Sequence, residues 1–316
     1  MRASRGFLKL GLLIGMGCGS AVPLAATTSP WTRNPQSAVR LVTPYAAAAR
    51  TGDLRLGVEF QLSPGWHAYW RNPGSAGFPP AFNSQTPQLR ILETRWPAPS
   101  HFDLPGGLVA FGYANDVVYP LRARLQASGD TVRLTVNADY LVCEVECVPY
   151  RYDLALDQPL ADAATTDPEG EAALAQWESQ VPAAAGQADA ASASVAWKDD
   201  THGELRLAFP SATGKPDLFF EIHDLLELGT PVRQAGDEVA FVVPATRRDT
   251  RRPLPRAGDV AWTLVGLEGP GPRAIEGHTS LELATGHHAD WRWIAAAAVL
   301  GAILVAFVAR RRPSLG

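Results

Sequence analysis

Apolar and polar residues alternate over much of the chain, which is the pattern of half-buried β-strands. In residues 53–62 the even positions are apolar, with one break at Gly57. The same period of two returns in residues 132–136 and 148–156, and turn residues such as those at 63–65 separate the runs. This half of the chain therefore predicts a β-sandwich over residues 36–158.

Strand patterns resume in the second half of the chain as short runs at regular spacing. They occupy residues 194–197, 205–209, 218–222, 239–243, 261–265 and 274–283. Short strands separated by turn residues are typical of a sandwich. The predicted fold class is all-β, with two immunoglobulin-like sandwiches, the second over residues 194–286.

Residues 159–193 are rich in Ala, Asp, Gln and Gly, as expected of a linker, but they contain one helix signal. Asp167 suits an N-cap and Pro168 suits the first helical position. The apolar residues that follow recur at helical spacing up to Pro182: Leu174, Trp177 and Val181. We therefore expect a short helix inside the linker.

Both ends of the chain carry membrane-related signals. Arg2, Arg5 and Lys9 precede an apolar run that is too short to span a bilayer and ends in small residues, so residues 1–26 are predicted to be a cleaved export signal. Cys18 would leave with it.

Near the other end, residues 293–309 are uncharged and apolar, and Trp291 stands where an interfacial aromatic residue belongs. We therefore predict a single transmembrane helix over residues 291–309. The arginines of the 310–316 tail indicate a cytoplasmic C-terminus. The predicted location is the periplasmic side of a bacterial inner membrane.

Charge narrows the set of partners. The formal net charge of the whole chain is −4, and the predicted signal and tail carry several of its basic residues, so the exported part is more acidic still. Nucleic acid would be repelled by such a surface, and it is not an expected partner. No cofactor motif is present, so none is expected.

Cys143 and Cys147 are the two cysteines expected in the mature protein. Strand parity places Tyr140 and Val142 on the core face, which leaves Cys143 on the other face, and the same count leaves Cys147 opposite the core. If residues 144–146 form a hairpin tip, the two cysteines are cross-strand neighbours, close enough for a disulfide. Both sulfurs are then expected off the core.

A pair so close in sequence is either a structural staple or a redox centre. Closing so short a loop stabilises a fold by only about 1.5 to 2 kcal/mol, which is a weak reason for a purely structural disulfide. The neighbouring Glu144 and Glu146 disfavour a thiolate. Both features favour a resting disulfide that an incoming thiolate attacks.

Residues 65–80 concentrate aromatic side chains among Pro and Gly, which predicts a rigid loop rather than a strand. Trp66, Tyr69 and Trp70 would bind a partner from such a loop. The alternative is that these aromatics cap the sandwich core. His67 stands alone and is expected to be structural.

Taken in order, residues 66–80, Trp96–Pro99, Phe111–Tyr113 and the segment 140–149 resemble the exported N-terminal domain of the DsbD/ScsB group of thiol:disulfide interchange proteins. The resemblance covers roughly residues 38–160 and continues more loosely to about residue 285. It implies an immunoglobulin-like domain in which Cys143 and Cys147 are the redox pair, and it places Phe111 and Tyr113 at an aromatic cap over the disulfide.

The resemblance also implies partners. The pair would relay electrons to periplasmic thioredoxin-like proteins. Members of this group continue into a multi-span electron-conducting domain, whereas one predicted span follows here, so we expect a separate membrane electron donor. Two alternatives remain: Cu(I) binding by the two thiolates, and a non-catalytic partner-binding module with a structural disulfide.

Overall fold

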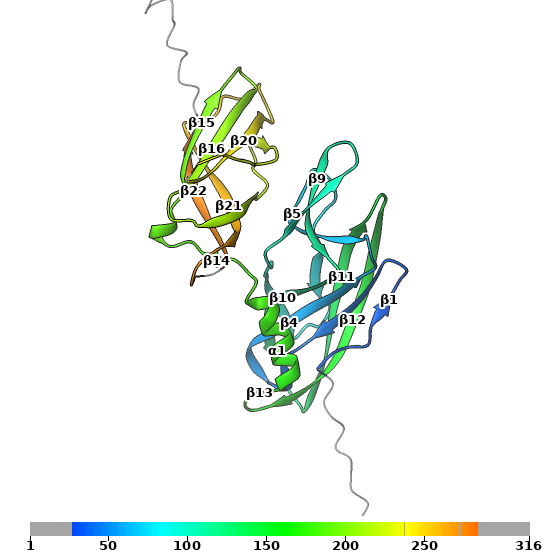
Figure 1. The fold of residues 1–316 in the computed structure, drawn as a ribbon. Coiled ribbons are helices and arrows are strands. Elements are labelled where there is room, and N and C mark those ends of the chain that lie inside the picture. The colour runs from blue at the N-terminus through cyan, green and yellow to red at the C-terminus, as the bar shows by residue number, and fades with distance from the viewer. Residues whose placement is uncertain (1–26, 237, 272, 284–316) are drawn as a thin grey trace, which may run out of the picture.

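The computed structural model describes residues 27–236, 238–271 and 273–283, and strands dominate these ranges. They form two sandwiches, each with its own apolar core, and one α-helix lies against the first (Figure 1). The all-β prediction is confirmed. Within the described ranges no helix is long and apolar enough to cross a membrane. The predicted signal (1–26), span (291–309) and tail (310–316) lie outside these ranges.

The first sandwich packs a five-stranded sheet against an eight-stranded one. The five-stranded sheet has the order β1 (Thr32–Arg33), β2 (Ser37–Val42), β4 (Thr51–Leu62), β10 (Asp116–Gln126) and β7 (Leu89–Thr94). The other has the order β13 (Thr165–Thr166), β3 (Tyr45–Ala49), β12 (Cys147–Ala161), β11 (Thr131–Cys143), β5 (His67–Gly74), β9 (Leu108–Ala114) and β8 (Ser100–Leu104), with β6 (Ala81–Ser84) also paired to β11.

The break at Gly57 in the alternating pattern has a packing reason. A β-carbon there would stand 2.6 Å from Cγ1 of Val118, 2.9 Å from Cγ2 of Val42 and 3.1 Å from Cδ1 of Leu174. The missing side chain therefore lets a helix approach the outer face of the five-stranded sheet.

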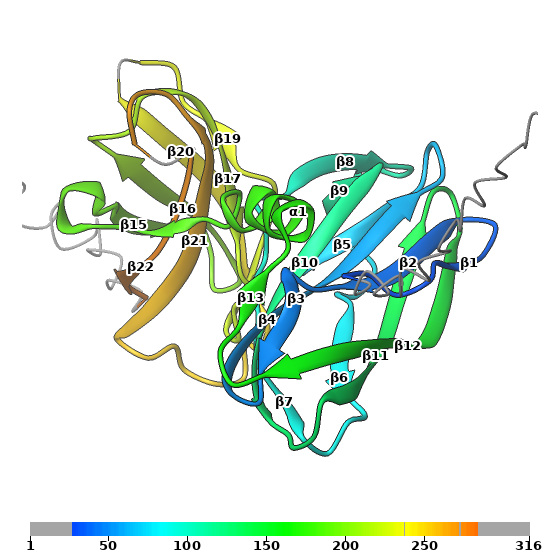
Figure 2. The same cartoon turned by 90° about the horizontal axis from the view of Figure 1, so that it is seen from below.

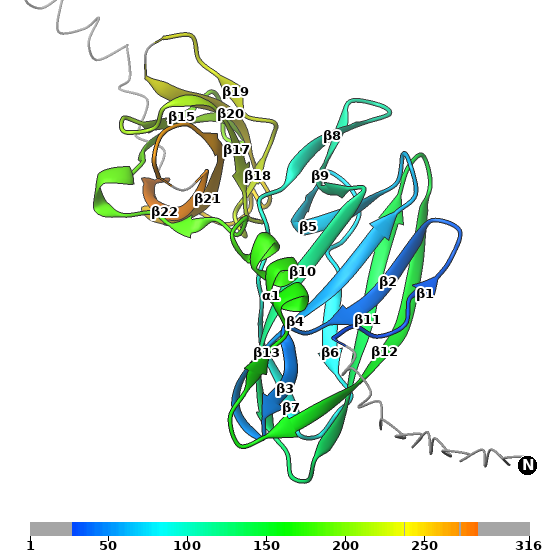
Figure 3. The same ribbon diagram turned by 60° about the horizontal axis from the view of Figure 1, so that its bottom comes forward.

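That helix, α1 (Pro168–Glu178), is the one expected from the sequence. Asp167 accepts a hydrogen bond from the backbone N of Gly170 at 2.8 Å, and Pro168 stands at the first helical position. Leu174 is fully buried against β2 and β10, and Arg55 of β4 binds Glu171 and Glu178. The helix thus lies over β4 and β10 (Figure 3), packed on the first sandwich.

The second sandwich pairs a four-stranded with a five-stranded sheet. The order is β14 (Ala183–Ala184), β22 (Ala274–Glu282), β21 (Ala257–Leu267) and β17 (Gly214–Phe220) in one. It is β15 (Ser192–Trp197), β16 (His202–Phe209), β20 (Val239–Arg247) and β18 (Leu226–Leu228) in the other, with β19 (Val232–Arg233) also on β20. A 3-10 turn, Gln187–Asp189, precedes β15. All six predicted strand runs of this half overlap observed strands.

The prediction of a loop over the aromatic segment is wrong for its centre. Residues His67–Gly74 form β5, a strand that pairs with β11 on one side and β9 on the other. Pro73 and Gly74, which suggested a loop, fall at the end of the strand, where the pairing with β9 becomes irregular. Figure 2 shows β5 in the middle of its sheet.

Candidate redox site at Cys143 and Cys147

The two cysteines close a β-hairpin. Cys143 ends β11, Cys147 begins β12, and the two stand opposite each other in the strand register. Their Cα atoms are 4.2 Å apart and their sulfurs form a disulfide. The backbone N of Glu144 donates to the carbonyl O of Glu146 at 3.2 Å and closes the tip. The predicted hairpin is confirmed.

The two cysteines differ sharply in exposure. Cys147 is exposed, whereas Cys143 is 2% exposed. Cys143 packs in a small cluster with Tyr69, Ala110 and Leu141, on the sheet face opposite the main core. The prediction that the pair lies off the main core is therefore right, but Cys143 is covered by a second, smaller apolar cluster, which the sequence analysis missed.

Tyr69 makes the polar contact to the disulfide. Its hydroxyl donates to Sγ of Cys143 at 2.9 Å and lies 3.8 Å from Sγ of Cys147. Burial raises the pKa of the Tyr69 phenol above its ordinary value, so the group keeps its proton at neutral pH. A protonated hydroxyl that donates a hydrogen bond to a sulfur atom can stabilise negative charge that develops on that sulfur.

His67 lies beside this cluster as a neutral ring. It stands opposite Cys143 in the pairing of β5 with β11, stacks on Phe102 at 4.9 Å and meets Tyr69 edge-on at 5.1 Å. Burial lowers the pKa of His67. Its Nε2 has no hydrogen-bond partner among the described residues. The ring therefore supports the site by packing.

Phe111 and Tyr113 do not cover the disulfide as the resemblance implied. Successive residues of a strand face opposite sides of the sheet, and Ala110 of β9 faces Cys143. Phe111 and Tyr113 consequently face the main core, where the Tyr113 hydroxyl donates to the carbonyl O of Pro97 at 2.7 Å.

The residues that do cover Cys143 come from the β8–β9 hairpin. Phe102 and Leu104 of β8 pack against the cluster that contains Cys143. In the sequence, the apolar Phe102 and Leu104 alternate with the polar His101 and Asp103. This short alternation was the sequence signal for a strand with one apolar face.

Trp66, Tyr69 and Trp70 have three different environments. Tyr69 contacts the disulfide, as described above. Trp70 is fully buried in the main core, and Trp66 is partly buried against that core. The alternative interpretation, in which these aromatics fill the core, therefore describes Trp70, and no partner can reach its side chain in this structure.

Metal ligands do not gather near the pair. In the described part of the chain no group of three or more His, Cys, Asp or Glu side chains is placed to hold a metal ion. In the disulfide form the two sulfurs are bonded to each other. Cu(I) would therefore need the reduced pair.

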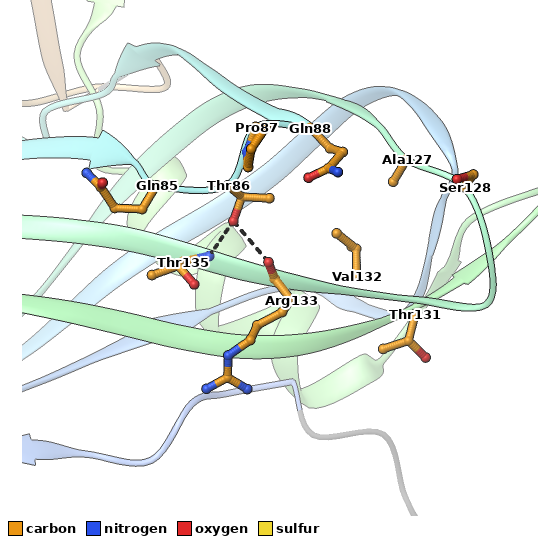
Figure 4. Close-up of a pocket in the computed structure, with 10 residues that line it drawn as sticks. All are labelled: Gln85, Thr86, Pro87, Gln88, Ala127, Ser128, Thr131, Val132, Arg133 and Thr135. Carbon is orange, nitrogen blue, oxygen red and sulfur yellow. Dashed lines mark hydrogen bonds between the residues drawn. The ribbon is translucent and has the colours of Figure 1, made fainter.

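A polar pocket of about 350 Å³ lies at the far end of β11. Its lining includes Thr86, whose hydroxyl donates to the carbonyl O of Arg133 and accepts from the backbone N of Thr135 (Figure 4). At about 3.3 Å per residue along the strand, Thr135 is some 25 Å from Cys143. These bonds brace the β6–β7 turn and are remote from the disulfide.

Comparison with known proteins identifies a family for part of the chain. Residues 38–159 match the family model described as thiol:disulfide interchange protein DsbD, N-terminal. The comparison with curated proteins gave no match.

Among solved structures, the N-terminal periplasmic domain of ScsB from Proteus mirabilis superposes with a TM-score of 0.64 at 22% identity, covering 81% of this chain and 98% of that one. This likeness shows a shared fold that includes both sandwiches. A protein of unknown function from Porphyromonas gingivalis gives a TM-score of 0.21 at 7% identity, over 78% of this chain and 99% of that one, and carries no argument.

The hairpin disulfide, the fold and the family match thus point the same way, and residues 38–159 of this chain belong to the family of N-terminal domains of the thiol:disulfide interchange protein DsbD.

Proposed function

We propose that this protein is a thiol–disulfide exchange module that passes electron pairs through the Cys143–Cys147 disulfide. One observation carries the proposal: the exposed Cys147 is joined to a Cys143 that is buried and hydrogen-bonded by Tyr69. One sulfur is open to attack, and the other is placed to leave as a stabilised thiolate. A structural staple needs neither feature.

The exchange proceeds in two steps. A thiolate of a reduced donor attacks Sγ of Cys147, the Cys143–Cys147 bond breaks, and Cys143 leaves as a thiolate that accepts the Tyr69 hydrogen bond. The second donor thiolate then attacks the donor sulfur of the mixed disulfide and releases Cys147. The donor ends as a disulfide and this protein as a dithiol, so two electrons have moved.

The dithiol reduces a client by the same chemistry in reverse. Cys147 attacks the client disulfide, and Cys143 then displaces the client thiolate and restores the resting disulfide. The family match supports thioredoxin-like proteins as clients. The exposed Val145, 85% accessible at the hairpin tip, offers such a client an apolar contact next to Cys147.

We place this chemistry in the periplasm. The ScsB domain of similar fold is a periplasmic domain, and an oxidising compartment allows the disulfide to persist. Residues 293–309 would tether the chain to the inner membrane, and a separate membrane protein would supply the electrons.

Trapping of mixed disulfides in cells tests the proposal with the full chain. Cys143→Ser leaves the exposed Cys147 without its resolving partner, so it should accumulate mixed disulfides with thioredoxin-like proteins, visible on non-reducing gels and identified by mass spectrometry. Cys147→Ser leaves only a buried thiol and should trap far less. A double Cys→Ser variant is the control.

Two results would overturn the proposal. One is that neither single variant captures a thioredoxin-like partner. The other is a reduction potential of the pair below about −300 mV, which is the range of inert structural disulfides.

A further inference from the structure

Strand β17 forms an edge of the second sandwich, and every second side chain along it points toward the first sandwich. Leu218 and Phe220 point into their own core. The alternate positions, Asp217, Phe219 and Glu221, all contact the first sandwich instead. The second sandwich therefore covers one face of this strand, and on the other face Phe219 is buried against the first sandwich.

Phe219 is the centre of this contact. It is 1% exposed and belongs to the apolar core of the first sandwich. Its ring centroid lies 4.4 Å from His101, 5.3 Å from Phe111 and 5.9 Å from Trp70. Phe219 therefore completes the core of the first sandwich, and the three rings that it contacts lie more than a hundred positions earlier in the chain.

The β8–β9 hairpin lies between Phe219 and the disulfide. His101 and Phe111 are paired in the hairpin register and contact Phe219. Phe102 and Ala110 are the adjacent register pair, and they point the other way, onto the cluster around Cys143. Phe219 thus supports the hairpin on the face opposite the one that covers Cys143.

Polar contacts fix the same geometry. Asp217 Oδ2 lies 3.3 Å from Nε2 of His101. On β5, Arg71 reaches Glu276 at 2.7 Å, and the amide nitrogen of Asn72 donates to the carbonyl O of Phe220 at 2.6 Å. Two of the strands that contribute to the disulfide cluster, β5 and β8, therefore make direct polar contacts with the second sandwich.

We propose that Phe219 is a positioning residue for thiol–disulfide exchange: it holds the β8–β9 hairpin over Cys143, so that an incoming thiol reaches Cys147 alone. This assigns a task to the second sandwich, namely to keep the attack on one sulfur. The inference rests on the exchange function proposed above. Its test measures cysteine accessibility without any partner, so it can fail while partner trapping succeeds, and the reverse.

The experiment labels the reduced full chain with a small alkylating reagent and follows each cysteine by mass spectrometry. In the unsubstituted protein Cys147 should be labelled well ahead of Cys143. In Phe219→Ala the hairpin loses its support and opens more often, so labelling of Cys143 should accelerate about tenfold while that of Cys147 stays unchanged. Phe219→Leu, which refills most of the space, should restore much of the protection.

Phe241→Ala is the matched control. Phe241 is buried in the second core against Phe209, so its truncation weakens the second sandwich without touching the hairpin. It should leave Cys143 protected. Equal exposure of Cys143 in the Phe219 and Phe241 variants would mean general loosening and would overturn the proposal.

An unchanged labelling ratio in folded Phe219→Ala would overturn it as well. If that variant does not fold, Asp217→Ala decides the matter. This side chain is 56% exposed, and its truncation removes the contact to His101 together with the hydrogen bond that Oδ1 accepts from the backbone N of Leu218. Labelling of Cys143 should then rise about two- to fivefold, and an unchanged rate would refute the proposal.

Discussion

The hydroxyl of Tyr69 is 0.9 Å nearer to Sγ of Cys143, at 2.9 Å, than to Sγ of Cys147, at 3.8 Å. It therefore lies on the covered sulfur, which is the leaving group in the exchange proposed above. A hydrogen bond to a charged group is worth about 1.5–3 kcal/mol. In the proposed exchange most of that benefit arises only when Cys143 carries negative charge, so Tyr69 would lower the barrier more than it stabilises the resting disulfide.

Removal of this hydroxyl should slow exchange. In Tyr69→Phe the ring still packs on the cluster, but the Cys143 thiolate loses its donor. We expect reduction by a small dithiol to slow about tenfold or more, since each 1.36 kcal/mol is a factor of ten. The reduction potential should also become more negative, because the reduced form loses its stabilisation.

Tyr113→Phe is the matched control for this prediction. It deletes a hydroxyl that donates to a backbone carbonyl on the other sheet face, and it should leave the exchange rate unchanged. An equal slowing in both variants would show that a general loss of packing, and not the contact to sulfur, sets the rate.

Gly77 should prove intolerant of a side chain because of its contact with Tyr69. Its φ is +91°, and a β-carbon there would overlap the Tyr69 ring. Gly77→Ala should therefore strain the backbone and displace the hydroxyl from Cys143, slowing exchange in the same direction as Tyr69→Phe.

Gly106→Ala is the control for the backbone strain that a side chain causes at a positive φ. Gly106 also has a positive φ, of +81°, but its β-carbon would meet nothing within 4 Å. Slowing of exchange in Gly77→Ala but not in Gly106→Ala would assign the effect to Tyr69. Equal exchange rates in the two variants would contradict a role for Tyr69 in this effect.

Much of the hairpin could be predicted from the sequence because its determinants are local. Alternation around Tyr140 and Val142 fixed which face of β11 meets the core, and the four-residue separation of the cysteines fixed the turn. The helix was equally predictable, since Asp167 and Pro168 mark its start. In each case neighbouring residues carry the whole signal.

The cover over Cys143 was not predictable in the same way. Phe111 and Phe102 are both aromatic, and the register of β8 with β9 decides which of them faces the disulfide. The local sequence of β5 favours a loop, because the strands that pair with it are distant: its partners in β9 lie 36–47 residues away and those in β11 lie 74–76 residues away. Phe219 shows the limit most clearly, because its burial depends on another domain.

The disulfide should contribute little to stability. Its loop is so short that the entropy removed from the unfolded chain corresponds to about 2 kcal/mol. Urea unfolding of the oxidised chain and of the double Cys→Ser variant should therefore differ by about that amount or less. A loss of about 4 kcal/mol or more would assign the pair a structural role and weaken the case for exchange.

Stability should fall as the pH drops through the range where His67 titrates in the unfolded chain. Burial lowers the pKa of His67 in the folded state below its ordinary value of 6.5. Between the two pKa values the unfolded chain binds more protons, so the free energy of unfolding decreases with decreasing pH. Well above pH 6.5 the ring is neutral in both states and no longer changes the stability.

The variant His67→Phe isolates this contribution, because a phenyl ring can still stack on Phe102 but does not titrate. Burial also lowers the pKa of His223, so both proteins lose stability in acid, but the variant should lose less. Urea unfolding from pH 8 to pH 5 should show its stability rising relative to the unsubstituted chain. Parallel curves would mean that His67 takes up its proton as readily in the folded state as in the unfolded one.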